Sequence, residues 1–222
     1  MDSIVFIIMD DFGADLPQYM SQCTSLKSDG VNFTNHFVTS PVCSPSRASM
    51  MTGMHCHNMG PSGIFGNDYP QGGYGVFGSI EDDGFQTALQ AAGYYTSFVG
   101  KYQNHYLTTG NANPALGFLY PALHVPNGWD DWWGPDSGLY NEFEYKVTQS
   151  IGGAAATLVD TTGGLKEDED YLTRKIQASA TASIARAAAA SKPLLLVVCP
   201  GATHSGGGGV DPEGKRWPAD PI

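Results

Sequence analysis

The sequence predicts an α/β fold in which helices flank a doubly wound, mostly parallel sheet. Three mainly apolar runs have the length of buried parallel strands, and they are Ile4–Met9, Tyr94–Val99 and Leu194–Val198. Two segments with helical spacing, Glu81–Ala92 and Asp168–Ala190, precede the second and third runs. This alternation of helix and strand is typical of an α/β sheet.

The first run, Ile4–Met9, predicts a central strand covered on both faces, because its residues are continuously apolar and largely β-branched. It is too short for the apolar region of a signal peptide, so we expect no leader in this chain, and its compartment stays open. Asp10 and Asp11 end the strand. Asp15–Asp29 follows with a weak helical pattern, and Val31–Val38 alternates apolar and polar residues.

Cys43 is predicted to lie just before a helix. Ser44 is a favoured N-cap residue, Pro45 suits the first helical position, and Gly53 marks the end. The amide groups and dipole at a helix N-terminus favour a thiolate or an anionic ligand, and Arg47 adds positive charge one turn along. Cys43 is therefore a candidate nucleophile, with a small buried side chain as the alternative.

The middle of the chain begins with Pro61–Gly78, whose Gly, Tyr and Pro content predicts an irregular loop. Glu81–Ala92 carries acids in its first turn and an apolar face, and Gly93 follows it, as expected for an amphipathic helix. Tyr94–Val99 is the next strand, and Lys101 comes shortly after it.

The second half opens with Thr108–Ser137, which is predicted to be a loop that contributes to substrate specificity. Glu142–Thr148 alternates and is predicted to form a small edge hairpin with Ala155–Val159. Asp168–Ala190 is the longest predicted helix, acidic at its start and alanine-rich at its end. The strand Leu194–Val198 then leads to His204.

Composition indicates one globular domain, with 222 residues of which 41% are hydrophobic and 15% charged. We expect this domain over residues 1–205 and a Gly- and Pro-rich tail over residues 206–222. The formal net charge of −11 argues against nucleic acid or an anionic membrane as the main partner, and no membrane span is predicted. Four cysteines fit a reducing compartment or a lightly cross-linked secreted protein equally well.

Chemically active side chains follow several of the predicted strands or lie at a helix start. They are Asp10, Asp11, Cys43, Arg47, Lys101 and His204. Because the carboxyl ends of parallel strands meet at one edge of a sheet, these residues are expected to share a pocket. Paired carboxylates offer hard oxygen ligands, which favours Ca²⁺ or Mg²⁺ over a soft metal, and of the two we expect Ca²⁺. Taken singly, the paired acids Asp10 and Asp11 are more often a solvated turn, and Lys101 and His204 are more often ordinary surface groups.

The segment Cys43-Ser44-Pro45-Ser46-Arg47, followed by Thr52-Gly53, resembles the signature of sulfatases, which belong to the alkaline-phosphatase superfamily. The resemblance extends over nearly the whole chain and is strongest to the glucosamine-6-sulfatase branch, which acts on sulfated glycans. The stretches that carry it are Val31–Pro41, His57-Asn58, Gly100–Asn104 and Gly128–Trp132.

The resemblance implies a sulfatase or alkaline-phosphatase-like fold and a sulfuric ester hydrolase that acts on a sulfate ester, with a sulfated sugar as the candidate. Cys43 would be converted to formylglycine by a formylglycine-generating enzyme, and Asp10, Asp11 and Cys43 would bind the metal. The hydrated aldehyde would attack sulfur and later expel sulfate. The resemblance further implies catalytic roles for Arg47, Lys101 and His204 beside Cys43, and substrate-binding roles for His57 and Asn104.

Three features differ from the family pattern. Gln103 occupies the position where many sulfatases have a histidine, with Asn104 or His105 as candidate substitutes. The residues around His204 lack the usual prolines, and the family's remaining metal ligands come from a segment beyond residue 222, so we expect a C-terminally truncated sulfatase. Two alternative functions stay open: a phosphodiesterase or phosphonate monoester hydrolase of the same superfamily, and a sulfatase-like binding protein without turnover.

Overall fold

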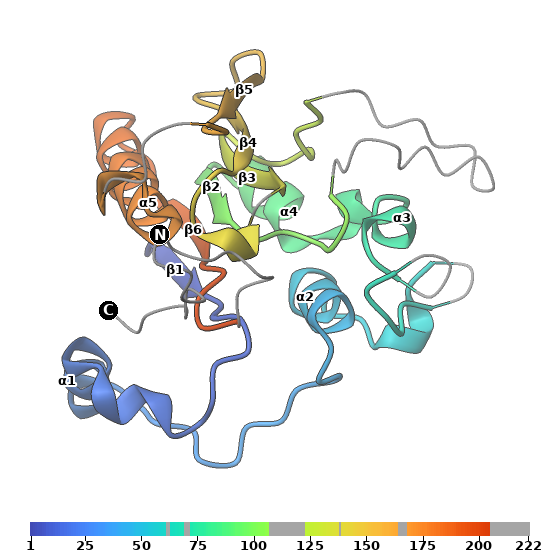
Figure 1. The fold of residues 1–222 in the computed structure, drawn as a ribbon, viewed down its shortest axis with the longest axis vertical. Helices are drawn as coiled ribbons and strands as arrows, with labels where there is room; N and C mark the ends of the chain where they lie inside the picture. Colours follow the sequence, from blue (N-terminus) through green and yellow to red (C-terminus); the bar gives the residue numbers. More distant parts are fainter. Residues whose placement is uncertain (61–62, 69–71, 107–122, 138, 164–167, 205–222) are drawn as a thin grey trace.

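The computed structural model describes residues 1–60, 63–68, 72–106, 123–137, 139–163 and 168–204 (Figure 1). The proposed tail, residues 206–222, lies outside these ranges, so the division into domain and tail stays a prediction. No helix in the described ranges is long and apolar enough to cross a membrane.

The described chain forms one six-stranded sheet in the order β1-β6-β2-β3-β4-β5. The strands are β1 (Ile4–Ile7), β2 (Tyr95–Gly100), β3 (Asp131–Ser137), β4 (Lys146–Ser150), β5 (Thr157–Asp160) and β6 (Leu194–Cys199). β1, β6, β2 and β3 run parallel, whereas β4 and β5 continue the sheet antiparallel. The mostly parallel sheet and the edge hairpin are therefore confirmed.

Helices cover both faces of the sheet, as predicted for a doubly wound fold (Figure 1). Alternate residues of β6 divide between two cores: Leu195 and Val197 belong to one, and Leu194 and Leu196 to the other. The first core includes residues of α2 (Cys43–Thr52), α3 (Tyr74–Phe77) and α4 (Phe85–Ala91), and the second includes residues of α5 (Leu172–Ala189).

The prediction that the first strand is central is wrong, because β1 lies at the edge of the described sheet and pairs only with β6. Although these side chains are apolar, Ile4, Val5 and Ile7 of this edge strand are between 42% and 55% exposed. The following helix α1 (Ser21–Asp29) has no buried residue, and residues 31–39 are exposed as well. The N-terminal segment therefore packs little against the described part of the molecule, and Figure 1 shows α1 apart from the sheet.

Two predicted loops contain regular structure. Helix α3 lies within Pro61–Gly78, and strand β3 occupies the end of Thr108–Ser137. Aromatic packing holds both elements in place. The ring of Trp132 in β3 stacks on that of Phe98 with the centroids 4.8 Å apart, and the ring of Tyr74 in α3 makes an edge contact with that of Tyr106 at a centroid distance of 5.1 Å. Tertiary packing of this kind overrides the local Gly and Pro signal.

The remaining predicted helices are present but shorter than predicted. The predicted helix Glu81–Ala92 divides at Gly84 into a 3₁₀ turn, Glu81–Asp83, and α4. Further 3₁₀ turns are Leu16–Tyr19, Cys56–Asn58, Leu139–Asn141 and Asp168–Asp170.

Candidate active site

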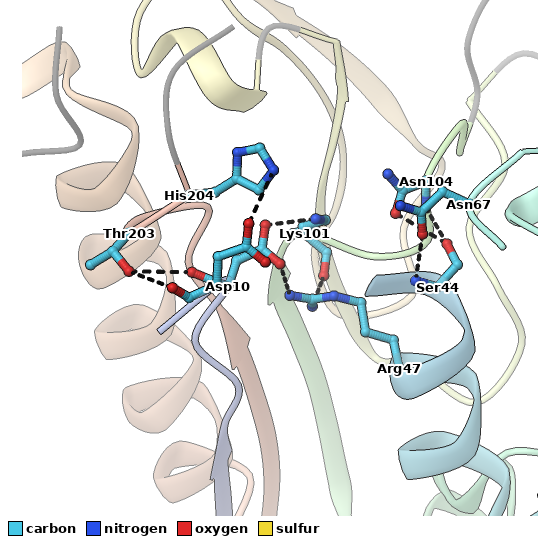
Figure 2. Close-up of polar contacts among 9 residues, drawn as sticks. Asp10, Ser44, Arg47, Asn67, Lys101, Asn104, Thr203 and His204 are labelled. Carbon is cyan, nitrogen blue, oxygen red and sulfur yellow. Dashed lines mark hydrogen bonds and ion pairs between the residues drawn. The ribbon is translucent and has the colours of Figure 1, made fainter. Parts of the chain in front are cut away.

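The carboxyl ends of β1, β2 and β6 meet beside the N-terminus of α2 and bring together residues from distant parts of the chain (Figure 2). Asp10 follows β1, Lys101 follows β2, and His204 follows β6. Gly100 permits this close approach, because a Cβ atom there would lie 2.1 Å from the carbonyl oxygen of Cys199, and its φ of +110° is one that side chains rarely adopt. The next amide, that of Lys101, donates to the same carbonyl.

Helix α2 begins two residues earlier than predicted, with Cys43 as its first residue and Val42 as N-cap. The prediction of Ser44 as N-cap is therefore wrong, and Pro45 is the third helical residue instead of the first. The Ser44 amide donates to Asn67 Oδ1 at 2.9 Å, so a side chain from another segment caps the helix. Gly53 ends the helix in the left-handed conformation, as predicted.

Asn104 supports the same helix end. The hydroxyl of Ser44 donates to Asn104 Oδ1 at 3.1 Å and accepts from the Asn104 amide at 3.0 Å (Figure 2). These contacts link the loop after β2 to the turn that carries Cys43. In this structure Asn104 contacts the helix that carries the candidate nucleophile.

A buried charge cluster occupies the centre of the site. Both carboxylate oxygens of Asp10 are paired, one with Arg47 at 3.2 Å and the other with Lys101 Nζ at 2.6 Å. Arg47 also donates to the carbonyl oxygen of Lys101 at 2.9 Å. All three side chains are 5% exposed or less, so the cluster brings two positive charges and one negative charge out of solvent.

The surroundings raise the pKa of both cations above their ordinary values. Burial lowers the pKa of Lys101, but the Asp10 carboxylate raises it by more. Burial likewise lowers the pKa of Arg47, and Cys199 and Asp10 raise it. Because burial raises the pKa of the Cys199 thiol, that group is uncharged near neutral pH, and Asp10 supplies the opposing charge. Lys101 and Arg47 therefore both remain charged.

His204 lies at the opposite side of this cluster from α2 (Figure 2). Its Nε2 atom is 3.4 Å from Asp11 Oδ2. The loop that carries it is fixed to the end of β1, because the Thr203 amide donates to the Asp10 carbonyl at 3.1 Å. Asp11 adopts a φ of +50°, and its side chain is 56% exposed. The imidazole thus reaches the site from the β6 side.

Ligand atoms of Asp10, Asp11 and Cys43 lie within 4.8 Å of one another. They line a cleft of about 260 Å³ that also includes Ser46 and Arg47. Two hard carboxylates fit Ca²⁺ or Mg²⁺, and the Cys43 sulfur marks where an oxygen would stand if the residue were formylglycine. The three residues supply part of the six to eight ligands typical of Ca²⁺.

His57 is not brought to this site. It is exposed and follows the C-terminal end of α2, whereas Cys43 begins a helix that is about 15 Å long. Its ring stacks on His55 at 5.7 Å. The substrate-binding role expected for His57 therefore has no geometric support in the described residues.

Sequence reasoning missed three residues beside the site: Asn67, which caps α2, Cys199, which lies against Arg47, and Tyr140, which stacks on His204. Each comes from a segment without a motif. A polar side chain in a Gly-rich loop was the available signal for Asn67, but nothing local connects it with Ser44, which lies 23 residues away.

Comparisons with known proteins agree on one family. A family model described as Sulfatase matches residues 2–220. The N-acetylglucosamine-6-sulfatase of Bos taurus is 31% identical over 179 residues, which cover 79% of this chain and 28% of that protein. The arylsulfatase of Volvox carteri is 29% identical over 185 residues, which cover 81% of this chain and 24% of that protein. The chain thus spans less than a third of the length of these curated relatives.

A solved structure described as a complex with its substrate, D-glucosamine-2-N,6-O-disulfate, has a similar fold. It superimposes with a TM-score of 0.58 at 18% sequence identity, over 91% of this chain and 35% of that chain.

Proposed function

Because this chain belongs to the sulfatase family, we propose that it hydrolyses sulfate esters at the cleft beside Cys43, with sulfated sugars as the substrate class. One observation carries the proposal: Arg47 and Lys101 converge on Asp10 beside the N-terminus of the helix that begins with Cys43. Two cations and a helix N-terminus favour an anionic substrate in a chain whose net charge is −11.

Arg47 and Lys101 would bind and orient the sulfate group. Both remain protonated, and burial strengthens their electrostatic interaction with an anion. Asp10 holds the two cations in place through its two oxygens. The caps on Ser44 from Asn67 and Asn104 hold Cys43 at the helix start.

Asp10, Asp11 and residue 43 would hold a divalent metal, Ca²⁺ or Mg²⁺, with Ca²⁺ favoured. Once bound, the metal would polarise the sulfate group, and a formylglycine made from Cys43 by a formylglycine-generating enzyme would supply the nucleophilic oxygen. His204 would donate a proton to the departing alcohol, and its contact with Asp11 holds the imidazole at the cleft.

The substrate class rests on the relatives. One curated relative is an N-acetylglucosamine-6-sulfatase, and a structure of the same fold is described with a disulfated glucosamine as its substrate. Both substrates carry a sulfate ester on an amino sugar. Glucosamine 6-sulfate is therefore the first natural compound to test.

The test uses the chain co-produced with a formylglycine-generating enzyme. Intact-mass analysis measures conversion at Cys43, and hydrolysis is followed with 4-nitrophenyl sulfate, glucosamine 6-sulfate and an aryl phosphate diester, with Ca²⁺ or with a chelator. We expect sulfate release that requires metal. Cys43→Ala should lower the rate by at least about a thousandfold, because it removes the nucleophile.

Cys23→Ala is the matched control, because Cys23 and Cys43 are both free and half-buried but Cys23 lies in α1. It should retain the parental rate. Preferential hydrolysis of the diester would instead favour the phosphodiesterase. Conversion of Cys43 without hydrolysis of any ester would favour a binding protein.

A further inference from the structure

Tyr140 lies between two of the candidate catalytic side chains, in the 3₁₀ turn Leu139–Asn141 that follows β3. Its ring stacks on the His204 imidazole, with the ring centroids 4.0 Å apart and an interplanar angle of 21°. The Lys101 ammonium lies 4.9 Å from the centroid of the same ring, within the range of a cation–π contact. One aromatic ring thus contacts residues that follow β2 and β6.

The turn that carries Tyr140 is packed tightly against the loop that carries His204. At Gly201, an added Cβ atom would lie 3.2 Å from both the carbonyl oxygen and the Cδ1 atom of Leu139. Leu139 in turn packs against the core that contains α5. The ring of Tyr140 is therefore supported by the body of the domain, and the His204 loop has little room to shift relative to it.

The contact between His204 Nε2 and Asp11 Oδ2 spans 3.4 Å, and the stacked ring of Tyr140 adds a restraint on the plane of the imidazole that this contact does not supply. Lys101 depends less on the ring, because Asp10 holds its ammonium at 2.6 Å. Loss of the Tyr140 ring should therefore affect the orientation of the imidazole more than the position of the ammonium.

We propose that Tyr140 is a positioning residue of the sulfate ester site, whose ring orients His204 for transfer of a proton to the departing alcohol. The proposal rests on the proposed function. It assigns the aromatic face, rather than the hydroxyl, to this task, so Tyr140→Phe should keep the role and Tyr140→Leu should lose it.

The dependence on the leaving group separates positioning from simple packing. A sugar alcohol is a poor leaving group and needs the proton, whereas 4-nitrophenolate leaves without one. With Tyr140→Leu, kcat for glucosamine 6-sulfate should fall about 10- to 100-fold, within the range that misplacement of a catalytic group causes. kcat for 4-nitrophenyl sulfate should change less than about threefold. Tyr140→Phe should restore most of the rate with the sugar.

Phe143→Leu is the matched control, because it also removes a buried ring close in sequence, and Phe143 packs on Tyr171. It should alter both rates equally or not at all. If Tyr140→Leu lowers the two rates by the same factor, or lowers neither, Tyr140 does not position His204.

An NMR experiment tests the stacking of Tyr140 on His204 without measuring turnover. In protein labelled with ¹³C at histidine, the ring proton signals of His204, assigned by their loss in His204→Gln, should be shifted upfield by the stacked ring in the parent and in Tyr140→Phe. They should move downfield in Tyr140→Leu. Unchanged signals would overturn the proposal. If the parent hydrolyses no sulfate ester, the proposed function fails, and this experiment alone decides whether Tyr140 orients His204.

Discussion

Asp10 is the residue on which the charge balance of the site depends. It is buried and faces two buried cations, so the cluster carries a net positive charge near neutral pH. The Asp10 carboxylate raises the pKa of Lys101 by more than burial lowers it, and Cys199 and Asp10 together raise the pKa of Arg47.

Replacement of Asp10 by Asn should destabilise the chain by about 3 to 5 kcal/mol near pH 7, because it leaves Lys101 and Arg47 buried without a counter-charge. In the parent, the raised pKa of Lys101 means that its contribution is present throughout the neutral range and is lost only as the pH rises through that raised value. In Asp10→Asn, burial and Arg47 remain, and both lower the pKa of Lys101.

A folded-state pKa below that of the unfolded chain makes stability rise with pH. The free energy of unfolding that Asp10→Asn loses relative to the parent should therefore become smaller between about pH 7 and about pH 10, as Lys101 gives up its proton in the folded variant. Urea unfolding with a chelator present measures it at both pH values. A loss that stays constant would show that Lys101 is not the group that titrates.

At the scale of the elements, mainly apolar runs correctly predicted the strands Tyr95–Gly100 and Leu194–Cys199, because parallel strands buried on both faces are mostly apolar. The same pattern wrongly predicted a central position for β1, because an apolar sequence does not show whether a strand has a neighbouring strand on both sides. The start of α2 was also misassigned, because the sequence rule assumes that Ser44 caps with its own hydroxyl, whereas here that hydroxyl contacts Asn104.

Helix α2 should lose stability when its cap from Asn67 is removed. Asn67→Ala leaves the Ser44 amide without its acceptor and should cost about 1 kcal/mol. Asn67→Asp keeps an acceptor and places negative charge at a helix N-terminus, so it should retain the parental stability. The free energy of unfolding in urea measures both.

Asn127→Ala is the matched control for this pair, because the Asn127 amide also makes a side-chain hydrogen bond, to the exposed Asp82 carboxylate, but caps no helix. It should change stability by less than about 0.5 kcal/mol. An equal loss in Asn127→Ala and Asn67→Ala would mean that the cap has no special contribution.

Across the whole molecule, topology explains why much of the candidate site could be anticipated. Asp10, Lys101 and His204 follow three neighbouring parallel strands, and parallel strands place such residues at one edge. Tyr140 could not be predicted, because it lies between the predicted loop Thr108–Ser137 and the predicted strand Glu142–Thr148. The packing of Leu139 on Gly201, which brings its turn to the His204 loop, is a tertiary contact without a local signal.

The exposed apolar surface and the net charge of the chain have opposing effects on its behaviour in solution. Phe33 and Phe37 are 77% and 85% exposed, and β1 presents an unpaired edge within the described sheet. Such surfaces favour self-association, whereas a net charge of −11 opposes it by repulsion between copies.

Because salt screens repulsion between charges but leaves apolar contacts in place, self-association of the chain should increase with ionic strength. The change should be clear between about 0.01 M and about 0.5 M salt, where the screening length falls from about 30 Å to under 10 Å. Light scattering at several protein concentrations measures it. The double variant Phe33→Ser with Phe37→Ser should reduce the association at high salt without changing the rate with 4-nitrophenyl sulfate. Association that weakens with salt would show that attraction between charged groups, rather than this apolar surface, drives it.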